Sequence, residues 1–145
     1  MAAGWTAHVN PAGFSIGIPP DWKIRPNAKC CALRADDRTG TIFVITEPVP
    51  AGITLEQYAD VLSVNIERGG VVEKVADDER TSVPAGPSIR LSLEGSYKGL
   101  TIAEVVYVLI DGSTGYTVLF STPREALATR LPVFDEMIES LRFTV

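Results

Sequence analysis

The chain has 145 residues and a mass of 15.6 kDa, enough for one domain that buries a hydrophobic core without disulfide or metal support. Hydrophobic residues make up 46% and charged residues 21% of the sequence, which excludes disordered and fibrous proteins. The formal net charge of −5 disfavours nucleic acid as the main partner, and the longest apolar run, Val105–Ile110, is far too short for a membrane-spanning helix.

The N-terminal part of the chain divides into an expected arm, residues 1–12, and the beginning of a single domain, residues 13–145. Within this domain, Phe14–Ile18 alternates apolar with small residues, which is the period of a half-buried strand. A turn follows at Pro19–Asp21, and Trp22 comes directly after it. We expect the Trp22 indole to pack at the end of the sheet, with ligand contact as the alternative.

A hairpin is predicted next, from strands at Lys29–Arg34 and Thr41–Thr46. Its second strand is apolar on both faces over Ile42–Ile45. Cys30 and Cys31 are neighbours in the first strand, so their side chains would point to opposite faces. Because a disulfide between neighbours needs a strained peptide, and the pair lacks the CxxC spacing of redox and zinc motifs, we expect two free thiols, one of them in the core.

The next segment predicts an amphipathic helix that begins at a capping box. Thr54 and Gln57 can each bond the backbone amide of the other, and Gly69–Gly70 ends the helix. One face of this helix carries an apolar stripe, formed by Leu55, Tyr58, Ala59, Leu62 and Ile66.

Several antiparallel strands are predicted after this helix. They are Val71–Val75, Arg80–Val83, Ser88–Glu94, Leu100–Ile110 and Gly115–Ser121. A short loop joins the last two strands, and the C-terminal residues 142–145 are expected to add a closing strand.

A second helix follows the strands. Thr122–Glu125 carries the signal of a helix start, with Pro123 in the first helical position and Glu125 in the third. Pro132 predicts either a kink or two short helices in tandem, because its ring removes an internal amide. The apolar stripe of this helix consists of Leu127, Leu131, Phe134, Ile138 and Leu141.

This order of elements predicts the α+β class, as a three-layer α/β/α sandwich with a central antiparallel sheet. Ile42–Ile45, Val105–Ile110 and Tyr116–Phe120 are apolar on both faces, so both sides of the sheet need cover. One helix on each face supplies it. If both helices lay on one face instead, the other face would expose an apolar patch that would be the partner site.

The sequence offers few groups for chemistry, so we predict no enzyme, no catalytic residue, no metal site and no cofactor. His8 is the only histidine, and it lies in the expected arm, a poor position for a catalytic base. Asp36–Asp37 and Asp77–Glu79 fit turns, with a bound calcium or magnesium ion as the alternative there. An enzyme would have to use carboxylates, such as Glu94 and Glu104 converging in a cleft.

Four residues are candidates for contact with a protein partner. Tyr97 and Lys98 lie in the predicted hairpin loop Gly95–Gly99, where they either contact a partner or only decorate the loop tip. Arg90 lies on the polar face of its strand. Trp5 either folds back on the sheet or belongs to a docking arm.

Charge and the start of the chain bear on partners and location. Residues 1–46 carry five basic and three acidic side chains, a local +2, whereas the remainder carries eight basic and fifteen acidic, a local −7. The positive stretch is either a solvated strand edge or a patch that faces an anion or an acidic partner. No signal peptide is visible. This predicts a cytoplasmic protein if Met1 is the natural start, and an extracytoplasmic envelope protein if the natural chain begins further upstream.

Four segments resemble the PsbP-like and Mog1-like domain family, in the family's order along the chain. They cover the opening strand and turn, the start of the first helix, the last long strand, and the final helix with its closing strand: Phe14–Trp22, Leu55–Ala59, Gly115–Pro123 and Phe134–Phe143. The resemblance implies an α/β/α sandwich without enzyme activity that docks to another macromolecule. Members include photosystem II accessory proteins, a regulator of the Ran GTPase, mycobacterial envelope lipoproteins and chaperones of secreted bacterial effectors.

The sequence therefore predicts a non-catalytic binding or accessory domain, of bacterial type, that docks to a protein partner. The alternative is a carrier of a small apolar ligand or lipid, with a pocket between sheet and helix. The identity of the partner stays open, as does the choice between a monomer and a homodimer.

Overall fold

Eight strands form the main sheet of the protein, as a computed structural model that describes residues 3–26 and 29–144 shows. These strands are β3 (Lys23–Ile24), β4 (Leu33–Asp36), β5 (Thr41–Pro48), β6 (Val72–Lys74), β7 (Glu79–Val83), β8 (Gly86–Tyr97), β9 (Leu100–Asp111) and β10 (Thr114–Pro123). Their order is β3-β4-β5-β10-β9-β8-β6, and β7 also pairs with β8. The pairings are antiparallel, as the consecutive hairpins predicted.

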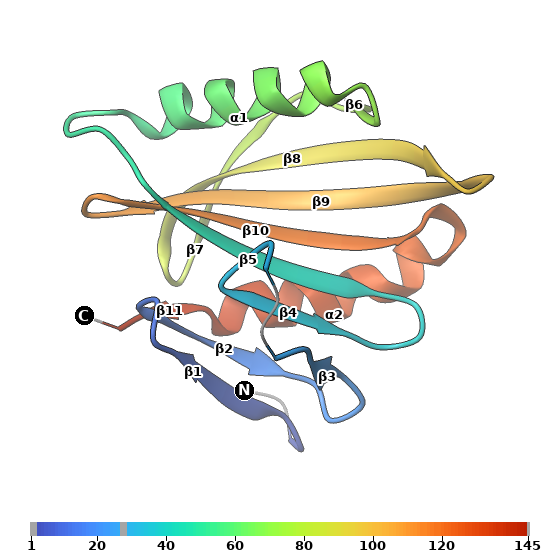
Figure 1. Ribbon diagram of the computed structural model, residues 1–145. Helices are drawn as coiled ribbons and strands as arrows, with labels where there is room; N and C mark the ends of the chain where they lie inside the picture. Colours follow the sequence, from blue (N-terminus) through green and yellow to red (C-terminus); the bar gives the residue numbers. More distant parts are fainter. Residues whose placement is uncertain (1–2, 27–28, 145) are drawn as a thin grey trace.

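A second sheet lies below the main sheet in Figure 1. It consists of β1 (Thr6–Asn10), β2 (Phe14–Ile18) and β11 (Arg142–Phe143), in the order β1-β2-β11. Residues 6–10 of the expected N-terminal arm are therefore not an arm but a strand. The physical reason is that β2 is buried, so its backbone amides need partners along both edges, and β1 and β11 provide them.

The first helix, α1 (Leu55–Gly69), begins and ends as the sequence predicts. The Gln57 amide donates to Thr54 Oγ1 at 3.1 Å, and the Thr54 amide donates to Gln57 Oε1 at 2.9 Å, which completes the capping box. Gly70 ends the helix in the left-handed conformation, with φ of 67°. Among the described residues, no helix is long and apolar enough to cross a membrane.

The second helix starts differently from the prediction. A 3-10 turn at Arg124–Ala126 leads into α2 (Leu127–Ser140), and no side chain caps either start. Thr122 does not cap the helix because it still belongs to β10, where it pairs with Ala103, and its hydroxyl donates to the Thr39 carbonyl oxygen at 2.6 Å. Pro132 lies inside a single helix of 14 residues, so the alternative of two short helices is wrong.

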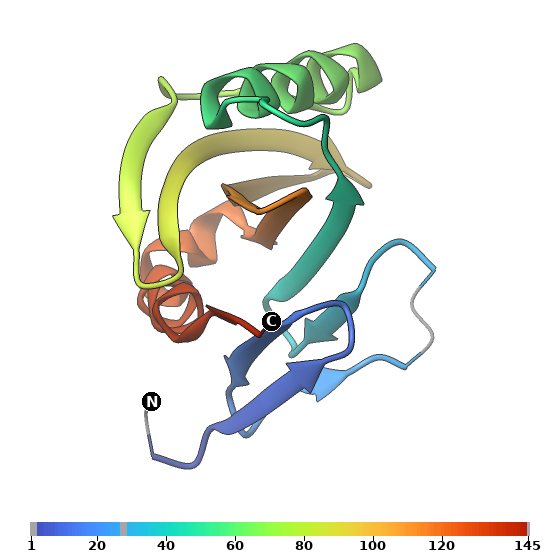
Figure 2. The ribbon, with the colours of Figure 1, turned by 90° about the vertical axis from the view of Figure 1, so that its left-hand side faces the viewer.

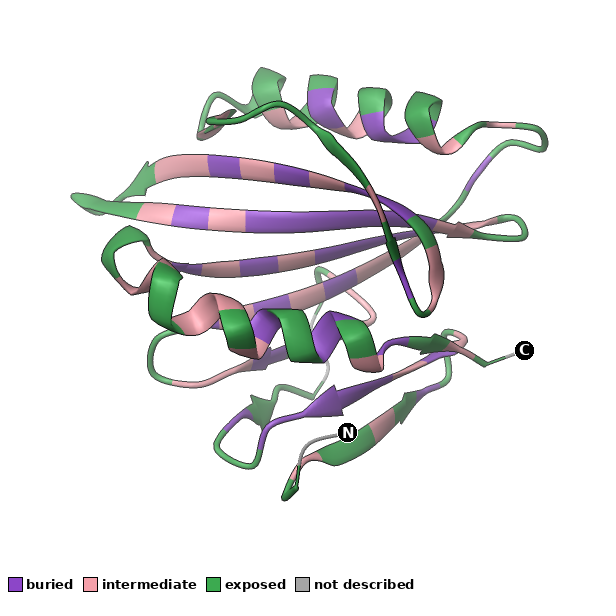
Figure 3. Ribbon diagram, turned by 180° about the vertical axis from the view of Figure 1, so that it is seen from behind, coloured by how far each residue is buried: buried purple, intermediate pink, exposed green. Residues whose placement is uncertain are grey.

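The two helices cover opposite faces of the main sheet, which confirms the three-layer α/β/α arrangement (Figures 1 and 2). Alternate residues of β9 point to the two sides. Val106 and Val108 belong to the buried cluster that contains Tyr58 of α1. Val105 and Tyr107 belong to the buried cluster that contains the apolar side chains of α2. Figure 3 shows the middle of β9 as one continuous buried stretch, because both of its faces are covered.

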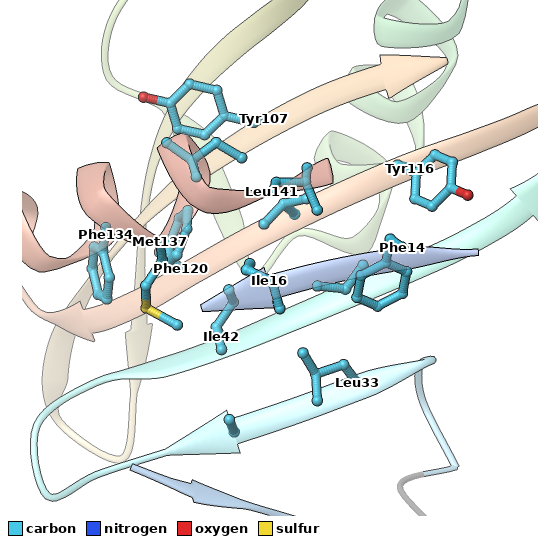
Figure 4. Close-up of a cluster of buried hydrophobic side chains, with 14 of the residues drawn as sticks. Phe14, Ile16, Leu33, Ile42, Tyr107, Tyr116, Phe120, Phe134, Met137 and Leu141 are labelled. Atoms are coloured by element: carbon cyan, nitrogen blue, oxygen red, sulfur yellow. The ribbon is translucent and has the colours of Figure 1, made fainter. Parts of the chain in front are cut away.

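The cluster on the α2 side also includes the small sheet. Figure 4 shows Phe14 and Ile16 of β2 beside side chains of the main sheet and α2. Phe120 stacks on Phe134 of α2 with ring centroids 4.5 Å apart. Trp22 is 7% exposed and meets the Phe134 ring edge-on, which confirms that its indole packs in the core.

Cys30 and Cys31 are joined by a disulfide, so the expectation of two free thiols is wrong. The expectation assumed that both residues lie in a strand. The first strand of the hairpin, β4, begins only at Leu33, and the two cysteines lie in the connecting segment before it. Their side chains therefore do not alternate across a sheet; Cys30 is exposed and Cys31 is half-buried.

Candidate functional site

The tip of the β8–β9 hairpin presents apolar side chains to solvent. Tyr97 and Leu100 are directly paired across the two strands and are 61% and 54% exposed. The two residues between them, Lys98 and Gly99, both have positive φ, 49° and 81°, as a two-residue hairpin turn requires. Lys98 Nζ lies 5.3 Å from the centre of the Tyr97 ring. Figure 3 shows this tip as exposed surface at the end of the sheet.

The start of β6 lies beside this tip. Val72 pairs with Gly95, which brings Val71 next to the last residues of β8. A Cβ atom at Gly95 would lie only 2.5 Å from the Val71 carbonyl oxygen, so glycine permits this close approach. Val71 is 63% exposed. We name the exposed group of Val71, Tyr97, Lys98 and Leu100 the hairpin corner.

A surface groove of about 720 Å³ adjoins the hairpin corner, between the end of α1 and strands β6 and β8. Its charged lining residues are Glu67, Glu73, Lys74 and Glu94. Lys74 is paired with Asp78, with Nζ 2.9 Å from a carboxylate oxygen. Within the described part of the chain, Glu67 and Glu73 have no ion-pair partner. The groove beside the apolar tip is therefore acidic.

Two of the four predicted contact residues lie elsewhere. The Arg90 guanidinium lies over the Tyr107 ring, 5.9 Å from its centre, and 4.0 Å from the Glu79 carboxylate, so its side chain is mostly covered. Trp5 is half-buried and packs against the α2-side cluster, which makes it part of the core margin. The structure brings together Tyr97 and Lys98, and it adds Val71 and Leu100, which the sequence analysis missed.

A second hollow, of about 590 Å³, lies at the β3–β4 edge within the positive N-terminal stretch. Its lining is entirely charged, with Asp21, Lys23, Arg25, Asp36, Asp37 and Arg38. Arg25 donates to both oxygens of Asp36, with Nη2 2.6 Å and Nε 3.0 Å away, and this pairing lowers the pKa of that carboxyl. Arg130 of α2 pairs with Asp37. Of the three carboxylates that line this hollow, those of Asp36 and Asp37 are thus already paired with arginines.

The carboxylates considered for catalysis do not converge. In the β8–β9 register, Glu94 pairs with Ala103 and Glu104 pairs with Leu93. Paired residues share a face and neighbours along a strand alternate, so the Glu94 and Glu104 carboxylates lie on opposite faces of the sheet. Across residues 3–26 and 29–144, no group of three or more His, Cys, Asp or Glu side chains could hold a metal ion.

Comparison with known proteins gives similar structures but no similar sequences. No family model and no curated protein matches the chain. The chain is similar to cyanobacterial PsbP (CyanoP) from Synechocystis, with 16% identity and a TM-score of 0.73 over 99% of this chain and 94% of that one. It is similar to LpqN of Mycobacterium tuberculosis, at 14% identity and a TM-score of 0.70 over 97% and 91%. The Ran-binding protein Mog1p of Saccharomyces cerevisiae follows, at 11% identity and 0.64 over 96% of each chain.

Proposed function

The chain has the PsbP/Mog1-like fold, and from this premise we propose that it is a non-catalytic accessory domain that binds a protein partner through the hairpin corner. The observation that carries the proposal is the group of exposed apolar side chains at that corner, Val71, Tyr97 and Leu100, beside an open groove. Exposed apolar side chains that gather at one place and have a polar rim are typical of interaction sites.

The chemistry of the hairpin corner supports a partner of a particular kind. Tyr97 supplies a large side chain with a hydroxyl group, the kind that dominates binding energy at interfaces. The groove next to it carries Glu67 and Glu73, which form no ion pair with any described residue, whereas its one cationic side chain, Lys74, is already paired with Asp78. A complementary partner therefore has an apolar segment that covers Tyr97 and Leu100, flanked by lysine or arginine side chains that face the groove.

The structures with this fold support a docking role and leave the partner open. Mog1p is a Ran-binding protein, and LpqN is involved in cell-envelope biogenesis. Since one fold serves different processes in these proteins, the partner of this chain must be argued from its own surface.

The alternative, a carrier of an apolar ligand, finds less support. A carrier would need a pocket between helix and sheet, and the pocket between α1 and the sheet edge has a volume of about 240 Å³. Four of its six lining residues are charged, namely Glu56, Asp60, Asp78 and Arg80. Sites for apolar ligands are larger than this and have mainly hydrophobic linings, so the pocket does not favour the carrier.

The test places a photo-crosslinking amino acid at position 97 in the cells from which the protein comes. The control carries the same amino acid at position 24, because Ile24 is also an exposed apolar residue, 40% exposed, but lies on β3 at the other edge of the main sheet. We expect a discrete adduct from position 97 and none of the same mass from position 24.

A second variant connects the adduct to the groove. The double substitution Glu67→Lys and Glu73→Lys reverses the rim charge without touching buried residues, and it should reduce the yield of the adduct at least tenfold. Adducts of equal yield from positions 97 and 24, or a yield from position 97 that ignores the charge reversal, would show that the corner is not the docking site.

A further inference from the structure

β1 is the outermost strand of the small sheet, and its outer edge is open in the described structure. The order β1-β2-β11 leaves one side of β1 unpaired. Figures 1 and 2 both show β1 at the end of the molecule opposite to α1, with no element beside its outer edge. This place is remote from the hairpin corner, so an inference drawn from it is independent of the proposed function.

The register of the small sheet identifies which backbone groups of β1 point outward. The Gly17 amide donates to Ser140 Oγ at 2.8 Å, on the side of β2 away from β1. Because the backbone groups of successive residues alternate between the two edges of a strand, Ile16 and Ile18 then face β1. Their partners are His8 and Thr6. The N–H and C=O groups of Ala7 and Val9 therefore point outward from the edge.

This edge is held in place at both ends. Asn10 is 8% exposed, and its side chain donates to the Ala32 carbonyl oxygen at 3.0 Å and accepts from the Ala12 amide at 2.9 Å. At the other end, Trp5 packs against the core cluster. The strand is thus fixed before any partner arrives, which lowers the entropic cost of pairing.

The edge also lacks the features by which proteins block pairing. Thr6–Asn10 contains no charged residue and no proline, and it pairs with β2 in continuous register without a bulge. By contrast, the segment of β6 and β7 at the edge of the main sheet is interrupted between Lys74 and Glu79 and carries several charges.

We propose that β1 pairs with β1 of a second copy of this chain, antiparallel and about a twofold axis that passes beside His8. In this register, Ala7 of each copy lies opposite Val9 of the other, and their outward N–H and C=O groups bond to each other. The two three-stranded sheets join into one continuous sheet.

A second copy fits this edge because the edge is complementary to itself. Ala7 and Val9 lie on either side of His8, so the twofold rotation places Ala7 of one copy opposite Val9 of the other. Every outward N–H and C=O group of these two residues then has a hydrogen-bond partner. No charge in the strand opposes an identical neighbour. Val9, which is 68% exposed, lies on the same face as Ala7 of the other copy and directly beside it, so the two apolar side chains make contact.

The test uses the register, because it predicts which single cysteine will link two copies. Residue 8 lies opposite its own copy in a pair without hydrogen bonds, where Cα atoms are about 4.5 Å apart, a separation that a disulfide spans. We expect purified His8→Cys to form a covalent dimer on mild oxidation. Ala7→Cys is the matched control, since residue 7 lies opposite residue 9.

If the copies were linked only by random collision, Ala7→Cys would cross-link faster than His8→Cys, because residue 7 is exposed and residue 8 is only half-exposed. Equal or faster linking of Ala7→Cys would therefore overturn the proposal. The unmodified chain is examined by sedimentation velocity from micromolar to millimolar concentration, where a small interface of this kind forms a weak dimer. Val9→Asp should abolish this dimer, and Val64→Asp on the outer face of α1 should leave it intact.

The remaining outcomes are also decisive. A wild-type chain that stays monomeric at every concentration excludes self-pairing. This holds even if the edge of β1 pairs with another protein instead. A dimer that survives Val9→Asp uses a different surface. Both results contradict the proposal, and neither affects the hairpin corner.

Discussion

Glu104 is a carboxylic acid placed within an apolar strand. It shares a face of β9 with Val106 and Val108, which pack on the α1 side of the sheet. Burial raises the pKa of the Glu104 carboxyl above its ordinary range, and among the described residues no charged group offsets this effect. The folded protein therefore holds the proton of Glu104 more tightly than the unfolded chain does.

Glu104→Gln tests this consequence. A carboxyl with a raised pKa in the folded state stabilises the fold below its unfolded pKa of about 4.3, and this contribution is lost as the pH rises through the raised pKa. The wild-type protein should thus lose stability over the mildly acidic range, and the Gln variant should lose less and be more stable at pH 7. Urea unfolding at several pH values measures both effects, and identical pH profiles for the two proteins would contradict the prediction.

Only part of the candidate site could be predicted from single residues in the sequence. Tyr97 and Lys98 precede a glycine between two predicted strands, which is a local signal for a hairpin tip. Val71 directly precedes β6, and its place beside the tip depends on the β6–β8 register, which no local pattern encodes. The contacts of Arg90 with Tyr107 and Glu79, which come from the two neighbouring strands, could likewise not be predicted from the alternation of its own strand.

Among the elements, α1 and its contact with the sheet depend on a close approach at β10. The ring of Tyr58, which is 2% exposed, lies against Gly115. A Cβ atom at Gly115 would lie 2.5 Å from the ring carbon Cζ, closer than side chains pack. Glycine at this position therefore lets α1 approach the sheet.

Gly115→Ala should destabilise the protein by about 1 to 3 kcal/mol, because the buried Tyr58 ring must move away from the new methyl group. Gly69→Ala is the matched control. Gly69 lies in the last turn of α1 with open space around it, so alanine should be neutral or should stabilise by up to about 1 kcal/mol. Thermal unfolding of both variants measures the difference. Equal unfolding midpoints for Gly115→Ala and Gly69→Ala would show that the close contact between Tyr58 and Gly115 does not contribute to stability.

Elements with local signals were predictable, and those determined by distant contacts were not. The capping box and apolar stripe define α1 completely. β1 was missed because its strand conformation depends on pairing with β2. The predicted start of α2 was wrong because Thr122 and Pro123 still belong to β10, which pairs with β9. The prediction of two free cysteines was also wrong, because β4 begins later than its sequence pattern indicates.

At the scale of the whole molecule, the two hydrophobic clusters share the same strands. Val106 and Val108 belong to the cluster on the α1 side, and their neighbours Val105 and Tyr107 belong to the cluster on the α2 side. Neither side can lose its packing without disturbing the strands that support the other. The apolar runs on both faces of these strands made this layered arrangement predictable from the sequence.

This shared support predicts a single unfolding transition. Ile16→Ala removes buried volume on the α2 side, and Leu91→Ala does so on the α1 side, so each should cost about 2 to 5 kcal/mol. Both tryptophans contact the α2-side cluster, so fluorescence reports that side, whereas circular dichroism reports the whole sheet. In guanidinium chloride, Leu91→Ala should lower the fluorescence midpoint as much as the dichroism midpoint. If the two sides unfold independently, Leu91→Ala will leave the fluorescence midpoint at its wild-type value, because that cluster will have kept its own packing.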